Sequence, residues 1–270
     1  MPTNSRKSTI LPEVRHKIAV SSGKGGVGKT TISVNLAVAL ARLEAVVGLL
    51  DADIYGPNVP MMMGVKKQPE TENRKIVPLE NHQVKLMSLG FIANKDSPVI
   101  WRGPIVGKMI QQFIDDVNWG PLDYLVVDLP PGTGDAQLTL AQTIEISGAL
   151  IVTTPQNVAL EDVSRSIEMF KQVEVPILGV VENMSYFICP CCGDKAHLFG
   201  SGGGTQIAKE YDIPILGQIP TNPAIRQGGD TGNPISTGDT EEALAFTMIA
   251  RKIIELIDEL EETGPEIRFS

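Results

Sequence analysis

The sequence predicts an α/β fold in which a mostly parallel central sheet carries helices on both faces. Short apolar segments rich in Val, Ile and Leu alternate with segments of helical length, which is the order that βαβ units produce. Gly and Pro number 26 and 19, whereas aromatic residues are only 5%, as is typical of aliphatic cores and tight turns in parallel sheets. The 270 residues allow one such domain or two small ones.

The amino-terminal elements follow from their apolar patterns. Residues 1–16 are polar and lack a periodic apolar face, so we expect a flexible arm. The aliphatic runs 17–21 and 45–50 predict buried strands, and the Ala- and Leu-rich segment 30–43 between them predicts a helix. Residues 57–63 suit a short helix.

A polar excursion from the sheet is expected next. Residues 66–83 form the most polar interior stretch, which indicates an exposed position. Its apolar ends, 76–79 and 84–89, are expected to pair as a hairpin around residues 80–82. The amphipathic segment 104–117 predicts a helix that leads back to the sheet.

The remaining elements alternate regularly. Strands are expected at 124–128, 149–153, 177–181 and 215–219, and helices at 135–146, 160–172, 203–210 and 241–261. Because no long linker or internal repeat interrupts this order, residues 17–262 are interpreted as a single domain and 263–270 as a carboxyl-terminal tail.

Charge and cysteine content exclude several classes of protein. Lys and Arg total 23 against 32 Asp and Glu, a net charge of −9, which argues against nucleic-acid and anionic-membrane partners because both need a basic surface. The chain begins with a polar segment instead of a signal peptide. All three cysteines fall within 189–192, unlike a disulfide framework, so we expect a cytoplasmic location.

A phosphate-binding motif lies between the first strand and the first helix. Residues 23–30, Gly-Lys-Gly-Gly-Val-Gly-Lys-Thr, fit the pattern G-x-x-x-x-G-K-[ST]. Its glycines let backbone N–H groups turn onto phosphate oxygens at a helix N-terminus. Lys29 is expected to reach the β- and γ-phosphates of ATP, and Thr30 to bind Mg²⁺ through its hydroxyl.

A second lysine opens this motif. Lys24 cannot easily reach the same phosphates as Lys29 from the same chain, but it can reach those of a facing subunit, as an arginine finger does. A solvated surface lysine is the alternative interpretation.

Acidic residues follow two of the predicted strands. Asp51 and Asp53 come after the second strand, and Asp128 ends the strand 124–128. Ligands of open α/β sheets bind at the carboxyl ends of the strands, so these carboxylates are expected near the phosphate loop. Asp128 resembles a Walker B aspartate that holds Mg²⁺ through water, with Asp51 as a further Mg²⁺ candidate. Asp53 is the candidate that orients the attacking water, although Asp also caps helices.

The cysteines form a C-x-x-C pair followed by glycine. Such a turn points two thiolates, here those of Cys189 and Cys192, at one metal. Cys191 is adjacent to Cys192, and neighbouring residues rarely bind one ion together. A site of four thiolates therefore needs a second subunit across a twofold axis. A zinc site completed by Asp194 or His197 and a thioredoxin-like redox pair are the alternatives.

Several segments together resemble the Mrp/ApbC family of iron–sulfur cluster carriers, within the MinD/ParA-like class of P-loop ATPases. The loop 23–30 is similar to the deviant Walker A motif of that class. The segments Asp-Ala-Asp-Ile-Tyr-Gly-Pro-Asn at 51–58, Asp-Leu-Pro-Pro-Gly-Thr-Gly-Asp at 128–135, Glu-Asn-Met-Ser-Tyr-Phe at 182–187 and Cys-Pro-Cys-Cys-Gly at 189–193 resemble the carrier family. The resemblance extends over about residues 10–260.

The resemblance implies an ATP-hydrolysing homodimer that holds a labile 4Fe-4S cluster between subunits. Such a carrier receives the cluster from scaffold donors and passes it to apo iron–sulfur proteins. It also implies roles for individual residues. Lys24 matches the signature lysine that acts across the dimer, Asp53 the switch I aspartate, Asp128 the Walker B aspartate, and Cys189 and Cys192 the cluster ligands. The implied nucleotide-binding residues are Gly23, Lys24, Gly25, Gly26, Val27, Gly28, Lys29, Thr30, Thr31 and, at the adenine, Asn183.

Two other functions use the same nucleotide-binding machinery. A positioning ATPase of the MinD/ParA kind needs a membrane-binding amphipathic tail or a basic DNA-binding face, whereas residues 261–270 are acidic and broken by Gly-Pro. A regulatory ATPase with a structural zinc ion at the cysteines is the third hypothesis.

Overall fold

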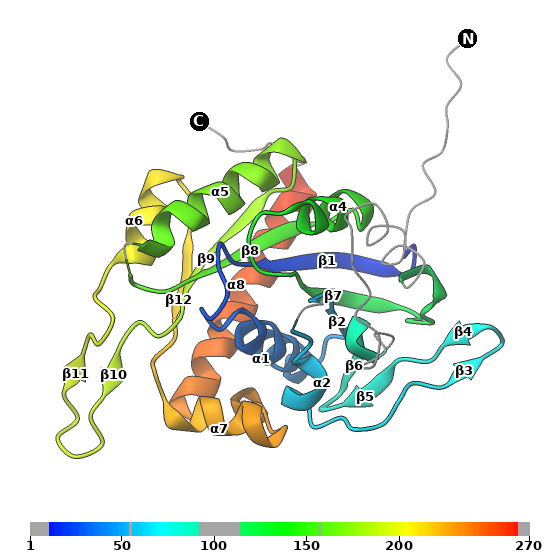
Figure 1. The fold of residues 1–270 in the computed structure, drawn as a ribbon, viewed down its shortest axis with the longest axis horizontal. Helices are drawn as coiled ribbons and strands as arrows, with labels where there is room; N and C mark the ends of the chain where they lie inside the picture. The colour runs from blue at the N-terminus through cyan, green and yellow to red at the C-terminus, as the bar shows by residue number, and fades with distance from the viewer. Residues whose placement is uncertain (1–10, 54–55, 92–113, 157, 264–270) are drawn as a thin grey trace, which may run out of the picture.

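The computed structural model describes residues 11–53, 56–91, 114–156 and 158–263. Its core is an eight-stranded sheet (Figure 1). In spatial order the strands are β12 (Ile215–Gln218), β9 (Ile177–Glu182), β8 (Gly148–Thr153), β1 (Val14–Ser21), β7 (Leu122–Asp128), β2 (Val47–Asp51), β6 (Val84–Ser88) and β5 (Leu79–Asn81). Neighbours run parallel except for β5, which is antiparallel to β6. The mostly parallel sheet predicted from the sequence is confirmed.

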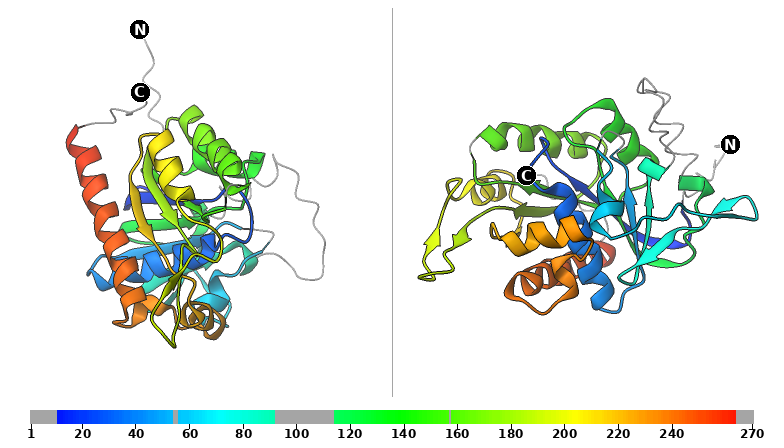
Figure 2. Two further views of the ribbon diagram at one scale, coloured as in Figure 1. Left: turned by 90° about the vertical axis from the view of Figure 1, so that its left-hand side faces the viewer. Right: turned by 60° about the horizontal axis from the view of Figure 1, so that its bottom comes forward.

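Helices cover both faces of this sheet. One face carries α1 (Lys29–Arg42), α2 (Val59–Met62), α7 (Pro223–Thr231) and α8 (Glu241–Thr263), and the other carries α4 (Asp135–Thr143), α5 (Val158–Gln172) and α6 (Gly203–Glu210). Figure 2 (left) shows α8 and α5 on opposite sides of the strands. Short 3-10 helices lie at Leu89–Phe91 and Ile235–Thr237.

The two faces have separate apolar cores, because successive strand residues point to opposite sides. Ile18 and Val20 of β1 pack against α1 and α8, whereas Ala19 packs with the α4 and α5 side chains. Both faces are covered, so β1, β2, β7 and β8 are buried along their length except at a few positions near their starts. The sheet is thereby rigid where its carboxyl ends position the site. Among the described residues, no helix combines the length and apolar character needed to span a bilayer.

The amino-terminal strand is longer than predicted. β1 begins at Val14, which pairs with Leu122 and is 4% exposed, so residues 14–16 of the predicted arm belong to the sheet. The prediction started the strand too late because residues 15 and 16 are polar, and polar residues are usually exposed. His16 is instead buried in the strand and stacks on Tyr124 with 5.3 Å between ring centroids. At the other end, α8 includes Thr263, the first residue of the predicted tail.

The predicted hairpin is present with its turn displaced along the chain. β5 and β6 are joined at His82 and Gln83, whose φ angles are 50° and 62°. Two successive positive φ angles match the twist of the flanking strands. Ile76 lies instead in β4. Of the predicted helix 104–117, residues 104–113 lie outside the described part, and residues 114–116 are helical.

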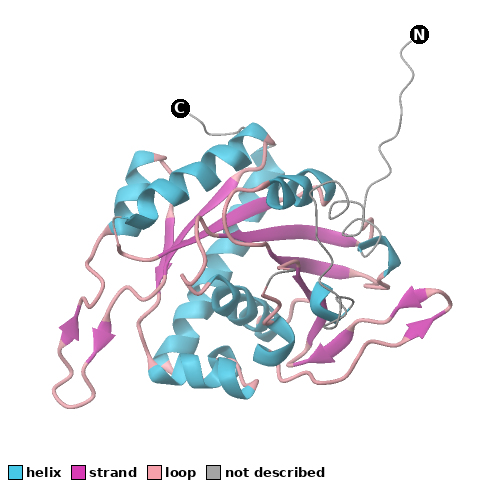
Figure 3. Cartoon of the chain, viewed as in Figure 1, coloured by secondary structure: helices cyan, strands magenta, loops and turns pink. Residues whose placement is uncertain are grey.

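Two small hairpins project from the body of the molecule, and neither was predicted. β3 (Thr71–Glu72) pairs with β4 (Lys75–Ile76), and β10 (Phe187–Ile188) pairs with β11 (Lys195–Ala196). Figure 3 shows the second hairpin reaching away from the sheet between β9 and α6. We call residues 187–196 the cysteine hairpin, because its tip carries the three cysteines.

Candidate functional site

The phosphate loop connects β1 to α1 at the carboxyl edge of the sheet. Gly28 precedes α1 with φ 85°, in the left-handed region. A Cβ at this position would lie 2.1 Å from Nδ2 of Asn183, so only glycine fits. The same Asn183 amide donates to the carbonyl oxygen of Val27 at 2.8 Å. The segment after β9 therefore supports the loop directly.

Asp128 gathers three side chains of α1 beneath the loop. Its Oδ1 lies 2.7 Å from Lys29 Nζ and accepts from Ser33 Oγ at 2.6 Å, while its Oδ2 accepts from Thr30 Oγ1 at 2.8 Å. Asp128 is fully buried and Lys29 is 6% exposed. This arrangement brings the predicted lysine, threonine and acidic residue together. Sequence reasoning missed Ser33, although its position one helical turn after Lys29 places it on the same face.

Asp51 is buried beside Asp128, its register partner on β7. Its carboxylate accepts from Ser88 Oγ at 2.9 Å and from the backbone N–H groups of Asp53 at 3.2 Å and Val59 at 3.3 Å. Burial, followed by the negative charge of Asp128, raises the pKa of Asp51 to about 7. Its hydrogen bonds tie together β2, β6 and α2, and Asp51 is not among the residues that line the adjacent cavity.

A cavity of about 450 Å³ opens in front of the loop, a volume ordinary for a small-molecule site. The phosphate loop forms one wall, and α2 and α7 form the other. Asp53 also lines it, and its Oδ1 accepts from the backbone N–H of Gly56 at 3.2 Å. The other lining residues are Ser22, Lys24, Gly25, Gly26, Gly28, Lys29, Thr30, Thr31, Gly56, Asn58, Met61, Met62, Pro131, Ile225, Arg226, Gly229 and Asp230.

The α7 wall was not foreseen. No helix was predicted at residues 223–231, where Gly228 and Gly229 lower the helix propensity. The sequence Asn222-Pro223 is nevertheless typical of a helix start. In the structure the Asn222 side chain caps the helix by accepting from the N–H of Ala224 at 2.8 Å, and Pro223 occupies the first turn.

The cysteines lie away from this cavity, at the tip of the cysteine hairpin. Cys189 is half-buried, and Cys191 and Cys192 are exposed. The N–H of Gly193 donates to the Cys189 carbonyl at 2.8 Å, which closes the turn. Hydrogen bonds from the backbone of Cys192, then from that of Cys191, lower the pKa of the Cys189 thiol. The turn is thus shaped to stabilise a thiolate, the form that binds metal.

The alternative zinc site within one chain is not assembled. His197 Nδ1 lies 3.1 Å from the carbonyl oxygen of Ser185, at the root of the hairpin. Asp194 Oδ2 is 3.3 Å from Cys192 Sγ. Within the part of the chain that the structure describes, no three His, Cys, Asp or Glu side chains are grouped to hold a metal ion.

The sequence matches a known family over nearly all of this fold. Residues 13–254 fit the ParA family model that describes the NUBPL iron-transfer P-loop NTPases. The chain belongs to this family. The cavity and the cysteine hairpin described above both lie within or beside the part of the chain that matches this NTPase family.

Named relatives are identical to this NTPase at about half of the aligned positions. It is 53% identical to an iron–sulfur cluster carrier protein of Synechocystis, over 89% of this chain and 70% of the relative. It is 48% identical to the iron–sulfur cluster transfer protein NUBPL of Dictyostelium discoideum, over 91% of this chain and 77% of the relative.

Solved structures share the fold of this NTPase. A nucleotide-binding protein from Archaeoglobus fulgidus in complex with ADP superposes with a TM-score of 0.75 at 39% identity, covering 83% of this chain and 89% of that one. The cell division ATPase MinD of Pyrococcus furiosus superposes with a TM-score of 0.67 at 25% identity, covering 89% and 99%.

Replacing Asp51 by asparagine is expected to flatten the pH dependence of stability of this NTPase. Because folding raises the pKa of Asp51 from 3.8 to about 7, the folded state binds more protons than the unfolded state between these values. The free energy of unfolding therefore falls as the pH rises through this interval. A shift of this size corresponds to roughly 4 kcal/mol. Urea unfolding across the interval measures the effect, and an equal pH slope in D51N would contradict it.

Proposed function

We propose that this NTPase binds and hydrolyses ATP with Mg²⁺ and carries a 4Fe-4S cluster as cargo to apo iron–sulfur proteins. The observation that carries the proposal is the Cys189–Gly193 turn, closed by the bond from the Gly193 N–H to the Cys189 carbonyl, on a domain of the NUBPL iron-transfer P-loop NTPase family. Two copies bind one cluster through Cys189 and Cys192 of each chain.

The cavity supports the nucleotide part of the proposal. The Lys29 ammonium group, which pairs with Asp128, also binds phosphate oxygens of the nucleotide. The backbone N–H groups of the loop bind the other phosphate oxygens. The donor set for Mg²⁺ consists of the Thr30 hydroxyl and, through water, the Asp128 carboxylate, both hard oxygen ligands. When bound, Mg²⁺ neutralises charge that develops on the phosphates. Asp53, at the cavity wall, orients the attacking water.

The proposal that two chains share one cluster rests on the number of cysteine thiolates that each chain supplies. Only two thiols of each chain have the spacing that suits one metal centre, and a cubane needs four, so a second copy supplies the missing pair. Exposed apolar side chains lie in the cysteine hairpin and just after it: Ile188 is 46%, Leu198 59% and Phe199 39% exposed. Such a patch favours burial against a second chain.

Anaerobic reconstitution with iron and sulfide tests the proposal. We expect one cluster for every two chains, with the mass of a dimer in solution. A single zinc ion per chain, with no labile sulfide, would remove the carrier function and leave the ATPase.

Lys24→Ala is expected to preserve ATP affinity and to lower hydrolysis at the partner's site. Lys24 lines the cavity, but no hydrogen bond or ion pair of its side chain is found among the described residues. Arginine-finger groups contribute roughly 10³- to 10⁵-fold to hydrolysis, and we expect a loss toward the lower end. Mixed dimers in which one subunit's own site is inactivated by Lys29→Ala show which subunit loses hydrolysis when Lys24→Ala is placed in one subunit or in the other. Equal loss at both sites would reject action across the dimer.

A further inference from the structure

Glu182, the last residue of β9, anchors the root of the cysteine hairpin. Its carboxylate is fully buried. Oε1 accepts from Ser185 Oγ and, at 3.0 Å, from Gln218 Nε2, while Oε2 accepts from the N–H of Gly204 at 2.6 Å. A buried carboxylate with this many donors is costly to disturb, because any donor removed leaves part of its charge uncompensated.

The three donors come from the segments that surround the hairpin root. Ser185 lies just before β10, Gly204 lies in the first turn of α6 after β11, and Gln218 ends β12. Close packing at Gly204 fixes the return segment, since a Cβ there would lie 2.9 Å from Cβ of Glu182. One side chain therefore holds both ends of the hairpin.

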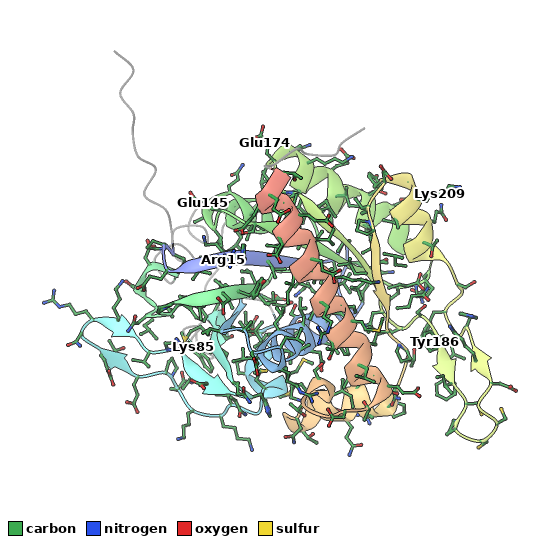
Figure 4. The ribbon with its side chains drawn as sticks, turned by 180° about the vertical axis from the view of Figure 1, so that it is seen from behind. Arg15, Lys85, Glu145, Glu174, Tyr186 and Lys209 are labelled. Carbon is green, nitrogen blue, oxygen red and sulfur yellow. The ribbon has the colours of Figure 1, made fainter. Side chains whose placement is uncertain are left out.

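The contacts of Ser185 extend this anchor onto the returning strand. Its carbonyl oxygen lies 3.1 Å from His197 Nδ1. The neighbouring Tyr186, where the hairpin leaves the body (Figure 4), has Lys195 Nζ 3.7 Å from its ring centroid. The returning strand and the residue just after it are thus tied to residues 185 and 186.

The same short segment reaches the phosphate loop in the other direction. Asn183 is 5% exposed and holds the carbonyl of Val27. Met184 adopts φ 55°, a left-handed conformation that is uncommon outside glycine. This kink lets Asn183 contact the loop while Ser185 turns back onto Glu182. We call residues 182–185 the β9 junction.

The geometry of the Val27–Gly28 peptide links the bond from Asn183 to the binding of phosphate. In the trans peptide that joins Val27 to Gly28, the C=O and N–H point in opposite directions. When Asn183 holds the carbonyl, the N–H of Gly28 faces away from it, in the orientation that a phosphate needs. Phosphate binding and the bond from Asn183 therefore reinforce each other.

We propose that the β9 junction couples nucleotide occupancy to the order of the cysteine hairpin, with Ser185 and Glu182 as positioning residues. The inference rests on the proposed function, since it makes ATP the effector and the cluster ligands the responding group. The segment after Asp128 is the other candidate route, and its Gly132 N–H donates to the Ser22 carbonyl. Among the described residues, no hydrogen bond joins 129–134 to 185–200.

Amide hydrogen exchange of the cluster-free protein tests the coupling, measured over residues 186–199 with and without Mg-ATP. In the wild type we expect nucleotide to slow exchange by about fivefold or more, the lower end of ordinary coupling between sites. Ser185→Ala should reduce this change to less than about twofold while ATP affinity stays unchanged. Gln218→Ala is the matched control, because it removes the other donor to the same Oε1 without touching the hairpin, and it should respond as the wild type does.

Three outcomes would overturn the inference: no response to nucleotide in the wild type, a full response in S185A, or an equal loss in Q218A. Circular dichroism and thermal unfolding establish that both variants are folded. Cluster content is measured separately, after anaerobic reconstitution. Absence of a cluster would reject the proposed function and leave the exchange result standing, whereas a cluster-binding protein without the exchange response would reject the coupling alone.

Discussion

Replacing Lys29 by alanine is expected to abolish productive Mg-ATP binding, with affinity falling by about a hundredfold or more. Each hydrogen bond between a charged group and its partner contributes roughly 1.5–3 kcal/mol, and about 1.4 kcal/mol corresponds to tenfold in affinity. Lys29 is expected to make such bonds to two phosphates. Isothermal titration of the variant with Mg-ATP gives the affinity directly, and an unchanged value would show that the loop does not bind phosphate in this way.

The same change also removes the partner of a buried carboxylate. Lys29 Nζ lies 2.7 Å from Asp128, which is fully buried, so the single variant loses on the order of 3–5 kcal/mol of stability. The double variant Lys29→Ala with Asp128→Asn removes the unpaired charge and should recover part of that loss without recovering ATP binding. Lys17→Met is the matched control: it removes another buried lysine of the same chain region, away from the cavity, and should keep wild-type affinity.

Loss of either predicted ligand thiol is the second large effect. Cys189→Ala and Cys192→Ala are each expected to lose the cluster almost completely after anaerobic reconstitution, since a dimer of either variant supplies only two of the four thiolates that a cubane needs. ATP affinity should stay unchanged, because the nucleotide cavity includes no residue of the cysteine hairpin. Iron and sulfide counts with parallel ATP titrations measure both quantities.

Cys191→Ala provides the matched control for Cys192→Ala. Both variants keep the backbone that donates to the Cys189 thiol, so they differ only in which side chain is missing. We expect Cys191→Ala to retain the cluster. If it lost the cluster and Cys192→Ala kept it, the ligand pair would be Cys189 and Cys191.

The parts of the site that the sequence predicted are those fixed by local motifs. The sequence predicted that Lys29, Thr30 and Asp128 lie close together, because a loop motif and a parallel sheet place them at one edge of the sheet. In the structure both Lys29 and Thr30 are within hydrogen-bonding distance of Asp128. Asp51 is different. Its strand was predicted, but its bonds to Ser88 and the start of α2 depend on packing between segments far apart in sequence.

The features that were missed depend on tertiary contacts. The α7 wall had cap signals at Asn222 and Pro223, but nothing local indicates that it faces the phosphate loop. The role of Glu182 was equally hidden, because a glutamate at a strand end is ordinarily exposed and only the convergence of Ser185, Gly204 and Gln218 makes it a buried anchor.

The position of β1 in the sheet has a consequence for how the chain folds. β1 precedes every other strand that the structure describes, yet it lies in the interior of the sheet, between β7 and β8. Its Val14 pairs with Leu122, and Ile18 pairs with Gly148. At roughly 5–20 residues per second, this apolar strand leaves the ribosome several seconds before either neighbour exists. Pairing at such long sequence separation is slow, so β1 stays unpaired on the nascent chain until well after its own synthesis, and the cavity beside the phosphate loop cannot form before then.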